Sequence, residues 1–151
     1  MALEINVGDK TIAVICSKDG SITIEDADEK SAAHDEYLKD LDESRLSLEG
    51  EPTRFIMRKV LPYSASKFIK NEQVSYTDGT PNVKMGFMLD EVRMSLVDIQ
   101  NPGVDDLKYK KGSDGYTSTK LMETIESIGI TTELYTARAN AVQSADVGKK
   151  S

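Results

Sequence analysis

Cysteine and histidine, which serve most often as nucleophiles, bases and metal ligands, each occur once in this chain, as Cys16 and His34. A zinc site needs about four such ligands, so these two residues cannot form one. Cys16 ends an apolar run over 11–16, and no cluster of basic residues adjoins it that would lower the pKa of its thiol. We therefore expect a small buried hydrophobic residue at Cys16 and a solvated helix residue at His34, rather than a nucleophile with its base.

Carboxylates are the remaining candidates for catalysis or metal binding. A calcium loop that starts at Asp26 fails, because its last position, which requires glutamate, is Tyr37. The sequence contains neither a glycine-rich phosphate loop nor a Gly-x-Ser-x-Gly elbow. A small metal-dependent enzyme that uses the loop carboxylates Asp105, Asp106 and Asp114 stays open as an alternative. Because these carboxylates have no convergent partners in the sequence, we predict no enzyme, no cofactor, no metal site and no small-molecule substrate.

The composition is that of one acidic domain. The 151 residues are 38% hydrophobic and 30% charged, with a net charge of −7. We predict a single domain over 1–146 and a disordered tail over 147–151. The acidity argues against a nucleic-acid partner. No segment approaches the ~20 apolar residues of a membrane-spanning helix, and the first residues lack the pattern of a secretory signal, so we predict neither membrane contact nor secretion.

Alternating apolar residues predict strands near the N-terminus. The expected strands lie over 3–7, 11–16 and 21–25. Turn residues at 8–9 and 18–20 would join them into an antiparallel meander. A further strand over 53–60 would place Phe55 and Met57 on one face, and Arg54, Ile56 and Arg58 on a half-exposed second face.

Helical spacing dominates the rest of the chain. Apolar residues recur at steps of three and four along 83–100, which predicts a central amphipathic helix there. They include Met85, Met88, Leu89, Val92, Leu96 and Ile99. Helices over 118–128 and 131–145, joined at Gly129, would form a C-terminal hairpin. The other predicted segments are an acidic helix over 26–43 capped by Asp26 or Asp28, a short helix over 64–71, a turn-rich loop over 77–81 and a polar loop over 101–117. We therefore predict an α+β fold, a small antiparallel sheet (the meander plus strand 53–60) packed with about four helices.

Charge is segregated along the chain. Residues 19–51 carry twelve acidic residues against three basic ones, whereas residues 52–84 carry six basic residues against two acidic ones. Two interpretations follow. The acidic helix can lie over the basic strand within one molecule, or the acidic face of one copy can meet the basic face of the next and build rings or lattices.

The second interpretation makes specific residues candidates for partner contacts. The basic candidates are Arg54 and Arg58 on the half-exposed strand and the loop patch Lys108, Tyr109, Lys110 and Lys111. The acidic candidates are Glu36, Asp40 and Asp42. A third possibility is that the methionine-rich face of the central helix binds a partner peptide, as in a chaperone or adaptor.

The stretch Glu49–Gly50–Glu51–Pro52–Thr53–Arg54–Phe55–Ile56–Met57–Arg58 resembles a strand found in small proteins of tailed bacteriophages. In those proteins a polar stretch, an amphipathic helix, a variable loop and a C-terminal helical segment follow, in the order expected here over 49–145. The resemblance implies a non-catalytic structural protein of the virion, such as a neck (head–tail connector), tail or accessory capsid protein. Its partners would be copies of itself and neighbouring virion proteins, and its location the virion or the host cytoplasm. A tail assembly chaperone that does not stay in the virion is the alternative.

Overall fold

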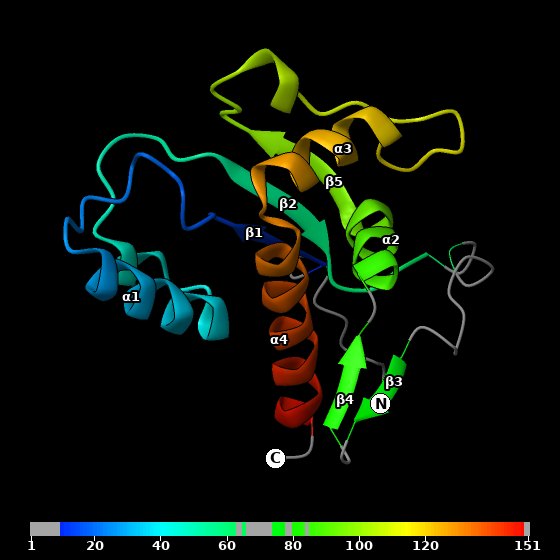
Figure 1. The fold of residues 1–151 in the computed structure, drawn as a ribbon, viewed down its shortest axis with the longest axis horizontal. Helices are drawn as coiled ribbons and strands as arrows, with labels where there is room; N and C mark the ends of the chain where they lie inside the picture. Colours follow the sequence, from blue (N-terminus) through cyan, green and yellow to red (C-terminus); the bar gives the residue numbers. More distant parts are fainter. Residues whose placement is uncertain (1–9, 63–64, 66–73, 78–79, 84, 150–151) are drawn as a thin grey trace, which may run out of the picture.

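The computed structural model describes residues 10–62, 65, 74–77, 80–83 and 85–149. Its centre is a three-stranded antiparallel sheet in the order β1 (Thr11–Val14), β2 (Arg54–Arg58) and β5 (Leu96–Gln100). Four helices pack with this sheet: α1 (Ala27–Asp40), α2 (Met85–Ser95), α3 (Thr119–Ile128) and α4 (Thr131–Lys149). The predicted α+β class is confirmed (Figure 1).

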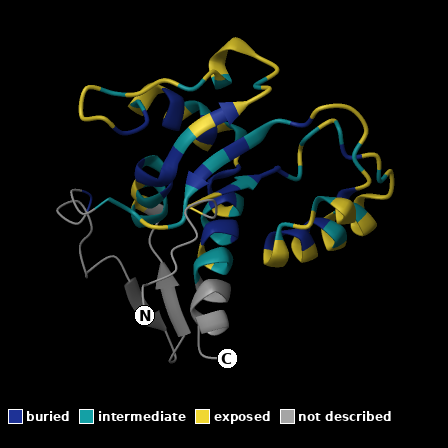
Figure 2. Cartoon of the chain, turned by 180° about the vertical axis from the view of Figure 1, so that it is seen from behind, coloured by how far each residue is buried: buried dark blue, intermediate teal, exposed yellow. Residues whose placement is uncertain are grey.

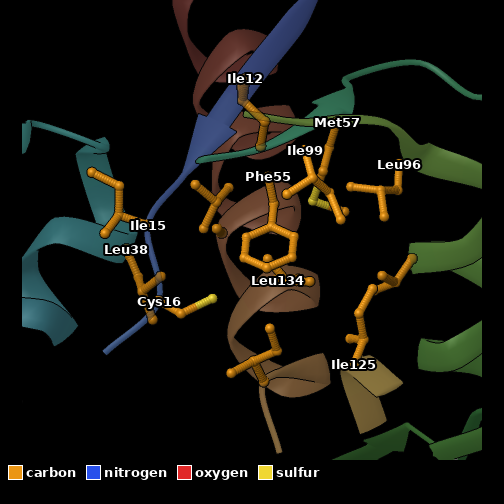
Figure 3. Close-up of a cluster of buried hydrophobic side chains, with 14 of the residues drawn as sticks. Ile12, Ile15, Cys16, Leu38, Phe55, Met57, Leu96, Ile99, Ile125 and Leu134 are labelled. Atoms are coloured by element: carbon orange, nitrogen blue, oxygen red, sulfur yellow. The ribbon is translucent and has the colours of Figure 1, made fainter. Parts of the chain in front are cut away.

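The central strand is β2, and its sequence shows why. Phe55 and Met57 are buried on one face, while Arg54, Ile56 and Arg58 are half-buried on the other, as the alternation predicts. Phe55 is only 2% exposed and lies among side chains from both neighbouring strands, α3 and α4 (Figure 3). The sheet therefore has one face in the core and a second, mixed face that is partly open.

The predicted meander is wrong in its pairing. β1 pairs with β2, residue Thr11 opposite Arg58, and does not form a hairpin with the segment over 21–25. In that segment Ile22 forms an isolated bridge with Leu48. Pairing β1 with β2 places Ile12 opposite Met57 and Val14 opposite Phe55, so the apolar rows of the two strands lie side by side. The predicted strand over 3–7 lies outside the described residues.

The predicted helix over 83–100 is two elements. α2 ends at Ser95, and β5 begins at the next residue. Opposite β2, Ile56 faces Asp98 but Met57 faces Leu96, so Val97 is the extra residue of a β-bulge. The bulge lets Leu96 and Ile99, three residues apart, both face the core. That spacing imitates one helix face, which is the reason the sequence favoured a longer helix.

The acidic segment forms α1, with Asp26 as its N-cap, and then the 3-10 helix η2 (Glu43–Leu46). The amide of Asn140 on α4 donates to the carbonyl of Leu38, and Tyr37 and Leu38 are buried. The acidic segment is therefore a packed part of the domain, although most of its outer surface is exposed (Figure 2).

Two C-terminal helices joined at Gly129 are confirmed, but α4 packs against α1 and α2 and does not fold back along α3 as a hairpin. Ser118 caps α3, and Gly129 ends it in the left-handed conformation, with φ of 83°. α4 continues through Lys149, into the range predicted as a tail, while residues 150–151 lie outside the described part. The loop over 101–117 contains a 3-10 turn, η5 (Asp105–Leu107).

Two further strands, β3 (Val74–Thr77) and β4 (Thr80–Val83), form an antiparallel pair around the predicted loop over 77–81. The sequence predicted the turn between them without the strands. The short helix predicted over 64–71 falls almost entirely outside the described residues.

Candidate protein-contact site

Cys16 and His34 are both buried, and the prediction of a solvated His34 is wrong. The imidazole is 3% exposed, with Nε2 at 2.8 Å from the carbonyl oxygen of Ile15 and 3.4 Å from Oε1 of Glu133. His34 precedes Tyr37 by one helical turn, so the two share a face of α1. This spacing, continued by Leu38 and Leu41, was the signal that could have placed His34 inside.

The contacts of this cluster tie α1 and α4 to the chain that leaves β1. Burial raises the pKa of the Cys16 thiol, and the nearby Glu133 carboxylate raises it further, so the reactive thiolate is disfavoured. The Ser17 hydroxyl and amide both donate to Glu133, at 3.0 and 2.7 Å. The Ser17 hydroxyl thus donates a hydrogen bond to the Glu133 carboxylate, whereas the hydroxyl of a nucleophilic serine would donate to a histidine imidazole. Glu133 ties the start of α4 to the chain that leaves β1, beside an open cleft of about 430 Å³.

The loop carboxylates proposed for metal binding bind different partners. Asp114 accepts a hydrogen bond of 2.7 Å from Nη1 of Arg93, which holds the pKa of its carboxyl below the ordinary value. Asp105 pairs with Lys108 at 3.0 Å on the exposed 3-10 turn. Within the described part of the chain, no three His, Cys, Asp or Glu residues are grouped so that they could hold a metal ion.

A larger cleft lies along the edge of the sheet. β1 pairs with β2 on one side, and no described strand pairs with its other side. An open cleft of about 590 Å³ follows this side between the end of α1 and residue Ala141 of α4. Its lining residues are Thr11, Ile12, Ala13, Lys39, Asp40, Leu41, Glu43, Lys59 and Ala141. We call it the β1 cleft. An edge strand of this kind can accept another strand by main-chain hydrogen bonds.

The register fixes which main-chain groups face the β1 cleft. The amide of Lys59 donates to the carbonyl of Lys10 at 2.9 Å, so residues 10, 12 and 14 bond toward β2. The amides and carbonyls of Thr11 and Ala13 therefore point outward. The Tyr37 hydroxyl supports this alternation, since it donates to Ala13 O at 3.3 Å and accepts from Ile15 N at 2.9 Å. Tyr37 closes the far end of the edge, and Thr11 and Ala13 remain along the cleft.

One end of the β1 cleft is acidic. Arg54 donates to Glu43 at 2.7 and 3.0 Å, and this pairing raises the pKa of its guanidinium. Arg45 donates to Asp40 at 2.6 Å and lowers the pKa of that carboxyl. The charged side chains linked in this region are Glu36, Lys39, Asp40, Asp42, Glu43, Arg45, Glu51 and Arg54. Acidic residues outnumber basic ones among them, so a negative surplus stays after pairing.

The other end of the β1 cleft is cationic. Lys10 and Lys59 are backbone partners there, and Arg58 stands opposite Thr11. Arg138 of α4 donates to the carbonyl oxygens of Arg58 and Lys59, at 2.9 and 2.8 Å. We call the three residues Lys10, Arg58 and Lys59 the cationic end, and the linked group around Asp40 and Glu43 the acidic end.

The nine residues predicted for partner contacts are thus divided. Arg54 and Asp40 lie in the acidic end, with Glu36 paired to Lys39 and Asp42 accepting from Ser44 as the cap of η2. Arg58 alone lies in the cationic end. Of the loop patch, Lys108, Lys110 and Lys111 are exposed, but Tyr109 packs against the core and its hydroxyl donates to Leu96 O at 3.1 Å. The sequence did not indicate Lys10, Lys59 or the edge of β1.

Comparisons of the chain with protein-family models, with curated proteins and with solved structures found no match. None of the helices in the described residues is long and apolar enough to cross a membrane.

Proposed function

We propose that this chain is a non-enzymatic structural protein that acts through protein–protein contacts, as a virion component of the tailed-phage kind: a neck, tail or accessory capsid protein. The observation that carries the proposal is the outer edge of β1, with which no described strand pairs and which lines the β1 cleft of about 590 Å³ between a cationic and an acidic end. Main-chain groups supply affinity at such an edge, and the two charged ends supply orientation.

The resemblance of residues 49–58 to phage proteins adds support of a different kind. The second half of this stretch forms β2. Thr53 joins the stretch to two other segments: its amide donates to Asp19 at 2.9 Å and its hydroxyl to the carbonyl of Asn101 at 2.6 Å. The stretch is therefore the centre of the scaffold. The contacts that we propose lie beside it, at the edge that β2 supports.

A chaperone or adaptor that is not retained in the virion is a second candidate, favoured by one observation. Val104 is 58% exposed in an apolar groove of about 360 Å³ that Leu107, Ile128 and Ile130 also line. A groove of this kind can hold an apolar partner segment for a limited time.

The test is the solution mass of the full chain, measured by size exclusion with light scattering at about 0.1 M and about 1 M salt, where the Debye length falls from about 10 Å to about 3 Å. The structural proposal expects a defined oligomer that loosens at high salt. A monomer at both salt concentrations and across the accessible protein concentrations would contradict it. A thermal shift with Mg²⁺, Mn²⁺ or Ca²⁺ would instead favour the metal-dependent enzyme.

A further inference from the structure

We propose that the β1 cleft is occupied by a second copy of this chain, with β1 of the two copies paired antiparallel about a twofold axis at Ile12. The two three-stranded sheets would then form one continuous sheet across the dimer. This inference rests on the proposed function and names its first partner.

The backbone of β1 is self-complementary in this register. The outward groups belong to Thr11 and Ala13, as the pairing with β2 requires. With Ile12 on the axis, Thr11 of one copy stands opposite Ala13 of the other, and each pair exchanges two main-chain hydrogen bonds. The register uses the outward amide and carbonyl of Thr11 and the amide of Ala13, while the Ala13 carbonyl, which already accepts from the Tyr37 hydroxyl at 3.3 Å, would accept a second bond. A twofold interface of this kind closes on itself and leaves no β1 edge free.

The charges favour the same antiparallel orientation. The cationic end lies at the start of β1, where Lys10 pairs with Lys59. The acidic end lies toward the end of β1. Continuing the register of β1 with β2 places Arg54 opposite position 15, and Arg54 forms an ion pair with Glu43 of the acidic end. Antiparallel pairing sets the cationic end of each copy against the acidic end of the other. A parallel arrangement would set like charges together.

Tyr37 sets the length of the interface. Its hydroxyl binds Ile15 N and Ala13 O, and thereby ends the open edge beyond Ala13. The strand contact is short, so we expect a dimer that dissociates measurably on dilution and in salt.

The first experiment compares Thr11→Pro with Thr11→Ala in the full chain. Proline removes the outward amide of Thr11 without removing a bond to β2, and edge strands tolerate it. Alanine keeps the amide and serves as the control. Light scattering should show a dimer for the wild type and Thr11→Ala, and a folded monomer for Thr11→Pro.

Three outcomes would overturn the inference. If the wild type forms a salt-sensitive oligomer that folded Thr11→Pro leaves unchanged, the structural function stands but another surface makes the contact. A wild-type monomer would contradict both proposals. If that monomer loses stability with Thr11→Pro but not with Thr11→Ala, the edge is covered within one chain.

A second experiment keeps the inference testable if Thr11→Pro does not fold. Lys59→Glu puts acid against acid across the axis, and Asp40→Lys puts base against base, so each variant alone should be monomeric. Mixed in equal amounts, they should form heterodimers, because both cross-axis contacts become attractive again. Failure of the mixture to dimerise, with both variants folded, would exclude this arrangement.

Discussion

The two arginines of β2 lie four residues apart on the same half-exposed face, yet their surroundings differ. Arg54 is held by two hydrogen bonds to Glu43 and a longer contact with Glu51, and its side chain is 23% exposed. Arg58 stands beside Lys59 and across from Thr11, and the carboxylate of Glu91 pairs with Arg138, the residue that donates to the Arg58 carbonyl.

This difference confirms the first interpretation of the charge pattern, pairing within one molecule, at the Arg54 end of the strand, whereas contact between copies at the Arg58 end is our proposal. At Arg54 the acidic segment neutralises the basic strand within the chain. At Arg58 no carboxylate among the described residues forms an ion pair with the guanidinium. A charge count along the sequence treats the two arginines alike, and the ion pair of Arg54 with Glu43 separates them.

Arg54→Glu should have the largest effect of the four substitutions. It removes the hydrogen bonds to Glu43 and places a carboxylate against two others in a partly buried site. We expect the free energy of unfolding in urea to fall by about 2–4 kcal/mol. A double-mutant cycle with Glu43→Gln should show coupling between the two positions. An unchanged urea midpoint would mean that the pairing does not stabilise the monomer.

Tyr37→Phe should cost about 1–3 kcal/mol, because the buried amide of Ile15 loses its partner. Burial raises the pKa of Tyr37 above its ordinary value of about 10. A raised native pKa contributes stability that is fully present below pH 10 and is lost as the pH rises further. Urea unfolding at pH 7 and at increasing pH should therefore show that Tyr37→Phe loses less stability at alkaline pH than the wild type does. Equal losses would show that Tyr37 does not set the alkaline limit.

Arg58→Glu should leave the fold within about 0.5 kcal/mol of the wild type, since no described ion pair depends on its side chain. It should instead weaken self-association by up to about tenfold, measured by light scattering on dilution. The contrast with Arg54→Glu is the sharpest test of the comparison. If Arg58→Glu destabilised the monomer as much as Arg54→Glu, the two ends would not differ in role.

Asp40→Asn should have the smallest effect on stability. The hydrogen bond from Arg45 lowers the pKa of Asp40. A lowered native pKa contributes stability above the ordinary aspartate pKa of about 3.9, and that contribution is lost as the pH falls through the native value. As the pH falls, Asp40→Asn should therefore lose slightly less free energy of unfolding than the wild type does. Asp35→Asn, on the same helix, is the matched control, and equal profiles for the two variants would assign no role to the Arg45 contact.

The sequence predicted the elements that local signals specify. Asp26, one of the two predicted caps, and Gly129 mark helix ends by their own chemistry, and the alternation around Phe55 shows which face of β2 is buried. It could not predict what depends on distant pairing: the neighbour of β1, the end of α2 at Ser95, or the burial of His34 against Glu133. For the same reason the sequence indicated only part of the candidate site. Its charges are local, whereas the open edge arises from the order of strands in the sheet.

The bulge at Val97 gives β5 an unequal tolerance to sequence change. A different side chain at this position alters little, because Val97 is half-buried and stands outside the regular pairing. Loss of the residue itself would restore a regular register in which Leu96 and Ile99 lie two residues apart, both still face the core, and Asp98 still faces outward. Over divergence, this segment should accept either a replacement or a loss at position 97 while keeping apolar residues at 96 and 99. The apolar pair is thus a more durable mark of the fold than the length of the strand.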